Sequence, residues 1–407
     1  MFTNKKVFIA GLSLAYILSS SALAADKVFI DKKNDSINSL YQLGSEYQFT
    51  NANVTKLPNG KVLYKLAEYF KSVQVWDTAI VSRKADFNKE ASQNDVIGGS
   101  FIMNIEKDLN NVTPVIDEQH AIEIAKSRYE TNKFAAQEPD PDAKANLYVR
   151  NTDNKAELVW VVDFLKDKNT SRPFTIINAN SGVIIDSWSG LAPKDALDPS
   201  NPDKKNDKYA HSPHYDPIEF DNHCPINNPP YASLITQVNN PEIFDRESGR
   251  KFTKENSGLL YTNQSGAINE SFSDIAEAAK LYVDNEDSSI TKCLQVMRFE
   301  DPTADGFSIS HARDYITNMD VYYSSGIFKR AFYLLAHKPG WTTKKAFDTF
   351  VAANQLYWTQ ESNFESGASG VYNAARDLEY NVNDVQEIFD TVGIRIKCYA
   401  HHSTFML

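Results

Sequence analysis

The stretch NSGLLYTNQSGAINESFSD, residues 256–274, stands near the start of the part of the chain that turns helical after Phe244. Further on, apolar residues recur at helical spacing in three runs. These runs are Ile327, Ala331, Phe332, Leu334 and Leu335; Ala346, Phe347, Phe350, Val351 and Tyr357; and Val385, Ile388, Phe389 and Val392. Because apolar faces on neighbouring helices must pack together, we expect a mainly α-helical domain over residues 246–398.

Upstream, residues 25–191 have a strand-rich pattern with one clear helix. Runs of β-branched and aromatic residues predict strands at 62–64, 73–76 and 158–164. Asp117 stands where an N-cap is expected for a helix that carries Ala121 and Ile122. Asn180-Ser181-Gly182 separates two apolar runs and predicts a hairpin. We therefore expect an α+β region.

Residues 192–245 differ in composition from both flanking parts. Nine of the chain's sixteen prolines lie between Pro193 and Pro241, among Asp, Asn and Lys. Proline lacks the N–H group that a sheet ladder needs, so this stretch cannot supply many ladder hydrogen bonds. We expect a proline-rich linker.

The N-terminus predicts export. Lys5 and Lys6 precede an apolar run, and Ala22-Leu23-Ala24 follows it, which is the pattern of a secretory signal peptide over residues 1–24. No later segment approaches the roughly 20 apolar residues of a membrane helix. We expect a secreted or periplasmic protein that ends in a short tail, residues 399–407.

The overall composition excludes one class of partner. The net charge is −11, and no basic run is present, so the sequence argues against nucleic-acid binding. An apolar content of 42% is sufficient to build hydrophobic cores. Cys224, Cys293 and Cys398 form at most one intramolecular disulfide, which leaves their pairing open.

The quoted stretch, residues 256–274, resembles the segment that carries the third zinc ligand in the thermolysin-like metallopeptidase family, in its pseudolysin and vibriolysin branch. Residues 321–336 resemble the family's second conserved helix, and Pro339-Gly340-Trp341 continues the match towards Gly393. A match this long is far more specific than a short motif. Residues 25–191 are similar, more weakly, to the family's propeptide, which acts as intramolecular chaperone and inhibitor.

The resemblance implies an α+β propeptide-like region followed by the helical C-terminal lobe of such a peptidase. About 55 residues separate Leu191 from Arg246, where the family has a β-rich lobe that forms one wall of the cleft. A lobe of domain size needs more residues than that. We therefore expect the β-rich lobe to be largely deleted, with residues 192–245 as its remnant.

The family's chemistry rests on H-E-x-x-H, whose two histidines bind zinc and whose glutamate is the general base, together with a glutamate from the next helix. Counted back from Glu270 in the family's register, the histidine positions hold Arg246 and Arg250, and the base position holds Glu247. Arginine stays protonated and has no lone pair for a metal. We expect no zinc, and instead an ion pair between Glu270 and one of the arginines.

Other family positions are partly kept. Tyr322 stands where the family has a histidine that donates to the oxyanion, while Asp320, Arg298 and Asp274 match the histidine-orienting acid, the substrate-carbonyl arginine and an acid behind the zinc ligands. In the family's calcium site, Glu277 fits one position. Lys280 replaces a second acid, which argues against calcium. We therefore expect no cofactor.

Two sets of residues have more than one interpretation. Glu247 and Glu270 are vestigial catalytic groups or plain ion-pair partners of the arginines, and we favour the second. His211, His214, His223 and Cys224 carry metal-binding groups within a short span, but their spacing matches no known zinc pattern, and solvated loop histidines are common.

The predicted function is that of an exported homologue of thermolysin-like metalloendopeptidases without catalysis. Its role would be to bind a peptide or protein partner, such as an active peptidase relative, through the propeptide-like region or the residual cleft. The alternative is a secreted metalloendopeptidase with an altered metal site. A third possibility is a gene product with no selected activity.

Overall fold

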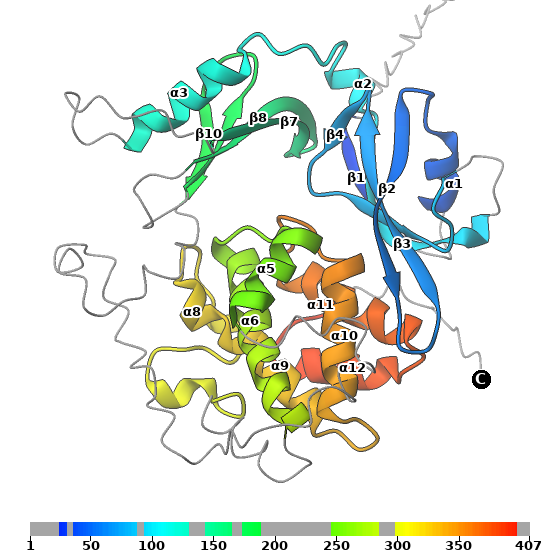
Figure 1. Ribbon diagram of the computed structural model, residues 1–407, viewed down its shortest axis with the longest axis vertical. Coiled ribbons are helices and arrows are strands. Elements are labelled where there is room, and N and C mark those ends of the chain that lie inside the picture. Colours follow the sequence, from blue (N-terminus) through cyan, green and yellow to red (C-terminus); the bar gives the residue numbers. More distant parts are fainter. Residues whose placement is uncertain are drawn as a thin grey trace, which may run out of the picture.

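The computed structural model describes residues 24–30, 36–87, 93–129, 143–164, 173–188, 246–284 and 298–396. A curled sheet from the N-terminal half lies against a group of helices from the C-terminal half (Figure 1). Residues 1–23 of the predicted signal peptide, the linker and the tail lie outside the described residues, as do all three cysteines and His211, His214 and His223. Of the helices that are described, none is long and apolar enough to cross a membrane.

The N-terminal half is built on a ten-stranded sheet in the order β1-β6-β5-β3-β4-β7-β8-β9-β10, with β2 paired to β3. The strands are β1 Asp26–Phe29, β2 Tyr47–Lys56, β3 Val62–Phe70, β4 Val73–Val75, β5 Ala79–Ser82, β6 Val96–Met103, β7 Lys144–Thr152, β8 Lys155–Asp163, β9 Phe174–Asn178 and β10 Ile184–Trp188. All pairs are antiparallel except the short β4–β7 pair, which joins two antiparallel parts into one sheet.

Helices cover parts of this sheet. They are α1 Ser36–Gln42, α2 Ile105–Asp108 and α3 Glu118–Tyr129. The predicted helix is confirmed in α3, where the Asp117 carboxylate accepts a hydrogen bond from the His120 N–H. The predicted hairpin is confirmed in β9 and β10, which pair antiparallel. The α+β expectation for this half is therefore correct.

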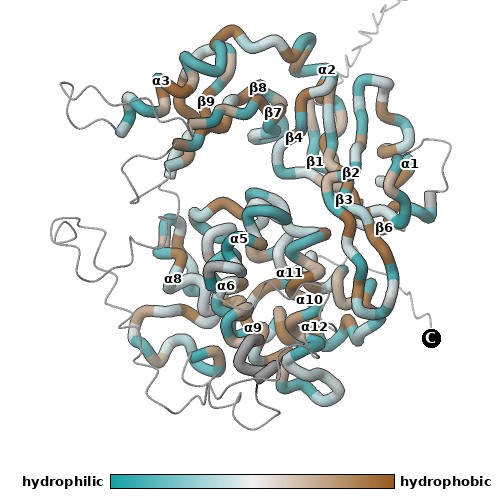
Figure 2. Tube along the Cα trace, viewed as in Figure 1, coloured by the Kyte–Doolittle hydropathy of each residue, from teal (hydrophilic) through white to brown (hydrophobic). Residues whose placement is uncertain are grey.

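The C-terminal half is helical, as predicted. Its helices are α5 Arg246–Asn256, α6 Asn263–Asp284, α8 Val321–Ser324, α9 Gly326–Ala336, α10 Thr343–Leu356, α11 Phe364–Asp377 and α12 Val382–Thr391. The three predicted apolar faces lie on α9, α10 and α12, and their buried residues join one hydrophobic cluster. Hydrophobic and hydrophilic residues follow one another along these helices, as amphipathic packing requires (Figure 2).

The packed face of helix α11 consists largely of small residues. A Cβ atom on Gly370 would lie 2.7 Å from the Trp358 ring, and one on Gly367 would lie 2.7 Å from Ile268 Cδ1. Only glycine lets the helix approach those side chains so closely. The periodicity of large apolar residues therefore did not predict this helix.

The two halves share a core. Leu57 of the β2–β3 turn belongs to the same hydrophobic cluster as the buried residues of the helices, as do Leu63, Val81 and Ile97 of the sheet. Burial of apolar surface stabilises by roughly 25 cal/mol per Å², so a common cluster ties the sheet to the helices.

One acid is buried inside the sheet. Glu68 on β3 has no exposed surface, and its carboxylate oxygens lie 3.0 and 3.2 Å from the Ile102 N–H donor. Burial raises the pKa of Glu68 to about 8. The folded state therefore holds this proton more tightly than the unfolded chain does.

We predict that Glu68 makes the fold less stable as the pH rises. The pKa of Glu68 is higher in the folded protein than in the unfolded chain. Its contribution to the free energy of unfolding is therefore complete below pH 4.5 and is lost between about pH 4.5 and 8. The loss is up to about 1.4 kcal/mol per pH unit. The free energy of unfolding, measured with urea at pH 5 and at pH 8, should differ less between the two pH values in Glu68→Gln than in the wild type. The exposed Glu118→Gln should behave as the wild type; an equal slope in Glu68→Gln and wild type would contradict the prediction.

Candidate functional site

The predicted ion pair lies between α5 and α6. Arg246 and Arg250 stand one turn apart on α5 and face Glu270 on α6. Arg246 Nη2 lies 2.5 Å from Glu270 Oε1, and Arg250 Nη2 lies 3.2 Å from Glu270 Oε2. Gly249 lets the helices approach, since a Cβ atom there would lie 3.1 Å from Ala276 Cβ. The expected pairing of an arginine with Glu270 is confirmed, and both arginines take part.

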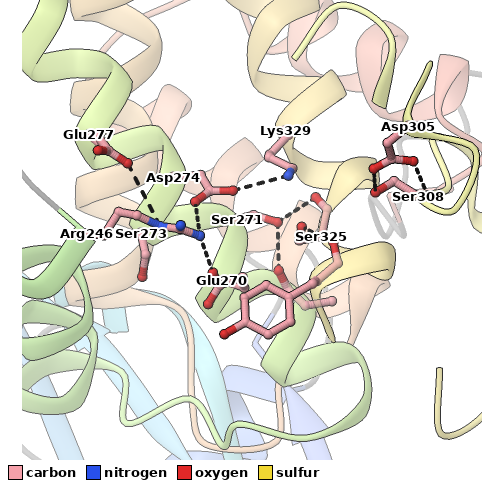
Figure 3. A network of polar contacts seen from close by, with 12 residues as sticks. Arg246, Glu270, Ser271, Ser273, Asp274, Glu277, Asp305, Ser308, Ser325 and Lys329 are labelled. Atoms are coloured by element: carbon pink, nitrogen blue, oxygen red, sulfur yellow. Dashed lines mark hydrogen bonds and ion pairs between the residues drawn. The ribbon is translucent and has the colours of Figure 1, made fainter. Parts of the chain in front are cut away.

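The ion pairs extend into a larger α5–α6 network, which includes Arg246, Arg250, Glu270, Asp274, Glu277 and Lys329. Figure 3 shows its Arg246, Glu270, Asp274, Glu277 and Lys329 side chains. Arg246 Nη2 lies 2.6 Å from Asp274 Oδ1, and Lys329 Nζ of α9 lies 3.1 Å from Asp274 Oδ2. Arg246 Nε lies 3.9 Å from Glu277 Oε2. Three cations thus balance three carboxylates, and the network connects three helices.

Burial makes this balance necessary. The Glu270 side chain has no exposed surface, and that of Asp274 is 6% exposed. Burial alone would raise the pKa of Asp274, but the charges of Arg246 and Lys329 outweigh it and hold that pKa below its usual value. Asp274 is therefore ionised at neutral pH.

Two tyrosines line the Glu270 side of the network. The Tyr261 hydroxyl donates to Glu270 Oε2 at 3.0 Å, and the rings of Tyr261 and Tyr322 meet edge to face at 6.4 Å. Burial is the largest cause that raises the pKa of each phenol above its usual value, and the Glu270 charge adds to it. Both tyrosines are therefore neutral donors at neutral pH.

Other predicted site residues lie in different places. Asp320 is the N-cap of α8, where its carboxylate accepts from the Tyr322 N–H at 2.8 Å. Arg298 is exposed, and its charge acts on Asp305. Glu247 lies on α5 and Lys280 on α6, but both side chains are outside the described residues.

Tyr261 and Lys329 were not predicted from the sequence. Lys329 interrupts the apolar run Ile327-Phe328, Ala331-Phe332 on α9, and a lysine within such a run signals a buried ion pair. Tyr261 gives no comparable signal, because an aromatic residue before a helix is equally suited to a core position. Their contacts arise only when α9 and the 257–262 segment fold over α6.

The fold and this network define a class of domain. Residues 257–394 match the family model described as the thermolysin metallopeptidase alpha-helical domain. The chain is 30% identical to the "Neutral protease" of Vibrio proteolyticus, over 84% of this chain and 73% of that protein. It is 32% identical to the "Hemagglutinin/proteinase" of Vibrio cholerae, over 86% and 74%. The chain belongs to the thermolysin-like metallopeptidase family.

Sequence identity is higher over a shorter stretch with another relative. The chain is 51% identical to the "Zinc metalloprotease" of Helicobacter pylori over 150 residues, which are 35% of this chain and 58% of that protein. The alignment with the Vibrio proteolyticus protein runs over 449 positions, although this chain has 407 residues. That relative therefore has residues without a counterpart here.

The prediction that this protein takes no cofactor is wrong in the light of these comparisons. Members of the family are zinc metalloproteases, as the name of the Helicobacter pylori relative states, so zinc is the cofactor that the family relationship supports. Arg246 and Arg250, however, offer only donors and no lone pair, so this pair of side chains does not fit a zinc ion beside Glu270.

We predict that Glu270→Ala lowers the free energy of unfolding by about 3 to 5 kcal/mol, because it leaves two partly buried guanidinium groups without their shared carboxylate. Urea denaturation measures this change. Glu255→Ala is the matched control: its pair with Lys251 is also on α5 but is largely exposed, and its loss should cost less than about 1 kcal/mol. Equal effects of the two substitutions would contradict the structural importance of the network.

Proposed function

We propose that this chain is an exported member of the thermolysin-like family that does not hydrolyse peptides at the α5–α6 network. The observation that supports this most is the state of Glu270. Arg246 and Arg250 donate to one of its carboxylate oxygens, and Arg250 and Tyr261 donate to the other. A carboxylate that accepts hydrogen bonds from cationic or hydroxyl donors at both oxygens acts as a structural counter-ion.

The residue assignment is part of this proposal. Arg246 and Arg250 would occupy the family's two histidine positions, Tyr322 the oxyanion-histidine position, and Glu247 the general-base position. Tyr322 retains a hydroxyl donor, so its replacement alone would weaken catalysis and not abolish it. The two arginines are the decisive change. A protonated guanidinium group cannot coordinate and activate a water molecule, and it cannot polarise a carbonyl group in the way that a metal does.

The remaining role is binding. The N-terminal half would act as an inhibitor or chaperone module, as the family's propeptide does, toward a peptide or protein partner such as an active peptidase of the same family. The shared core between the sheet and the helices supports this, because the N-terminal half packs against a helical domain of this class within its own chain. Residues 1–24 would direct the protein out of the cytoplasm.

A second candidate function is a secreted metalloendopeptidase with an altered metal site. It is favoured by the 51% identity to the Helicobacter pylori zinc metalloprotease over 150 residues. The two candidates differ in whether the purified protein has chelator-sensitive peptidase activity.

We predict that the purified chain, supplied with zinc, degrades casein no faster than buffer alone and stays full length on incubation. The Vibrio cholerae relative serves as the positive control. Hydrolysis that a chelator stops, and that Glu270→Gln also abolishes, would overturn the proposal in favour of the second candidate. Hydrolysis that disappears when the protein is purified further would point to a contaminating protease.

A further inference from the structure

The main-chain nitrogen of Ala25 lies in a buried position beside a carboxylate. Ala25 has no exposed surface, and its N–H donates to Asp108 Oδ2 at 3.1 Å. The same oxygen accepts from the Ala156 N–H at 2.9 Å. Asn151 lies beside them, since its Nδ2 donates to the Ala25 carbonyl oxygen at 3.5 Å. We call Asp108, Asn151 and the Ala156 N–H the N-terminal seat.

The sheet order brings Asp108 to this place. Strands β1 and β6 pair antiparallel, so Met103 at the end of β6 lies opposite Asp26 at the start of β1. The chain then turns through α2, whose last residue is Asp108, and α2 lies between the two parts of the sheet (Figure 1). Asn151 and Ala156 come from the other part, where they face each other on β7 and β8. The seat therefore joins both parts of the sheet to the residue before β1.

One acceptor of the seat is unused. Asn151 Oδ1 is buried and has no hydrogen-bond partner among the described residues. A buried acceptor without a donor costs free energy, so native proteins usually supply one. The Ala25 amide cannot do so, because a peptide nitrogen carries a single N–H group, and that group already donates to Asp108. A free ammonium group has three N–H donors, as the lysine side chain has, so two would remain after the bond to Asp108.

The sequence predicts that the chain is cut at this same residue. Ala22-Leu23-Ala24 ends the predicted signal peptide, so removal of residues 1–24 makes Ala25 the first residue. The nitrogen beside Asp108 then changes from a neutral amide into an amine, whose ordinary pKa of about 8 keeps it mainly protonated at pH 7. A hydrogen bond between ionised groups is about twice as strong as a neutral one. A buried ammonium group needs such a counter-ion, because an unpaired buried charge is costly.

We propose that the N-terminal seat binds the free α-ammonium group of Ala25, with Asp108 as its counter-ion and Asn151 Oδ1 as a second acceptor. The inference rests on the part of the proposed function in which residues 1–24 are removed on export. Because Ala25 is buried in the folded protein, the bond before it is cut before β1 pairs with β6. Removal of the signal peptide therefore stabilises the folded N-terminal half, and the uncut chain lacks this ion pair.

The first test measures how reactive the terminal amine is. The chain from Ala25 to Leu407 is released from a removable leader with either Ala25 or one added glycine as its first residue. The glycine restores the amide at Ala25 and moves the ammonium group by about 3.5 Å. At pH 7, acylation of the terminal amine should be at least about tenfold slower in the folded Ala25 chain than in the same chain in urea. The glycine chain should show a difference of less than about threefold.

The second test is a double-mutant cycle between the terminus and Asp108. With Asp108 present, the added glycine should lower the folding equilibrium constant, measured with urea, about tenfold, because the ion pair is lost. Asp108→Asn keeps an acceptor for the Ala156 N–H. In this variant the glycine should leave the constant unchanged or raise it, because the buried ammonium group of the Ala25 chain has no counter-ion.

Asp153→Asn is the matched control. Asp153 is exposed between β7 and β8, and asparagine tolerates its left-handed backbone with φ 52°. In this variant the added glycine should have the same effect as in the wild type. If Asp108→Asn does not fold, the acylation test decides alone.

Equal acylation rates of the two folded chains, or an equal effect of the glycine with Asp108 and with Asp108→Asn, would overturn the inference. Mass spectrometry of the exported protein then identifies its native first residue. Ala25 is the expected result, whereas another first residue would overturn the inference and leave the absence of catalysis as proposed. Peptidase activity, in contrast, would overturn the proposed function without changing the acylation rates.

Discussion

A fully buried carboxylate requires cations beside it, and the helical half of this protein is arranged around that requirement. Glu270 has no exposed surface, and two arginines one turn apart on α5 meet it from the facing helix. An unpaired buried charge costs several kcal/mol, so α5 is fixed in register and orientation against α6. Asp274 extends the constraint to α9 through Lys329, which places a third helix.

The N-terminal half is fixed by a different kind of contact. It supplies four apolar residues to the helical cluster, and its β2–β3 hairpin donates to carbonyl groups at three helix ends. A second polar contact runs in the opposite direction: Glu361 of the helical half accepts from Trp76 at 2.8 Å and from Arg150 at 2.9 Å. Polar groups of each half are therefore paired with groups of the other half.

The family relationship and the local chemistry give different information. Overall identity of about 30% over most of the chain establishes membership of the thermolysin-like metallopeptidase family. Relatives of this chain include zinc metalloproteases, and this corrects the prediction of a protein without a cofactor. The contacts of Glu270 concern a single site, where arginine and tyrosine donors surround the carboxylate. Function follows from such a site and not from the fold, because one fold supports many chemistries.

The sequence by itself determined the class of each half and the opposing charges of Arg246, Arg250 and Glu270, because apolar periodicity and residue type are local properties. It did not determine α11, whose small residues become informative only against Trp358. Nor did it identify Tyr261, Lys329 or Lys65 as partners of distant groups. The Tyr261 and Lys329 contacts depend on how the 257–262 segment and α9 pack on α6. The Lys65 contact joins residues 293 positions apart, and only the tertiary structure decided it, since main-chain carbonyl groups leave no trace in a sequence.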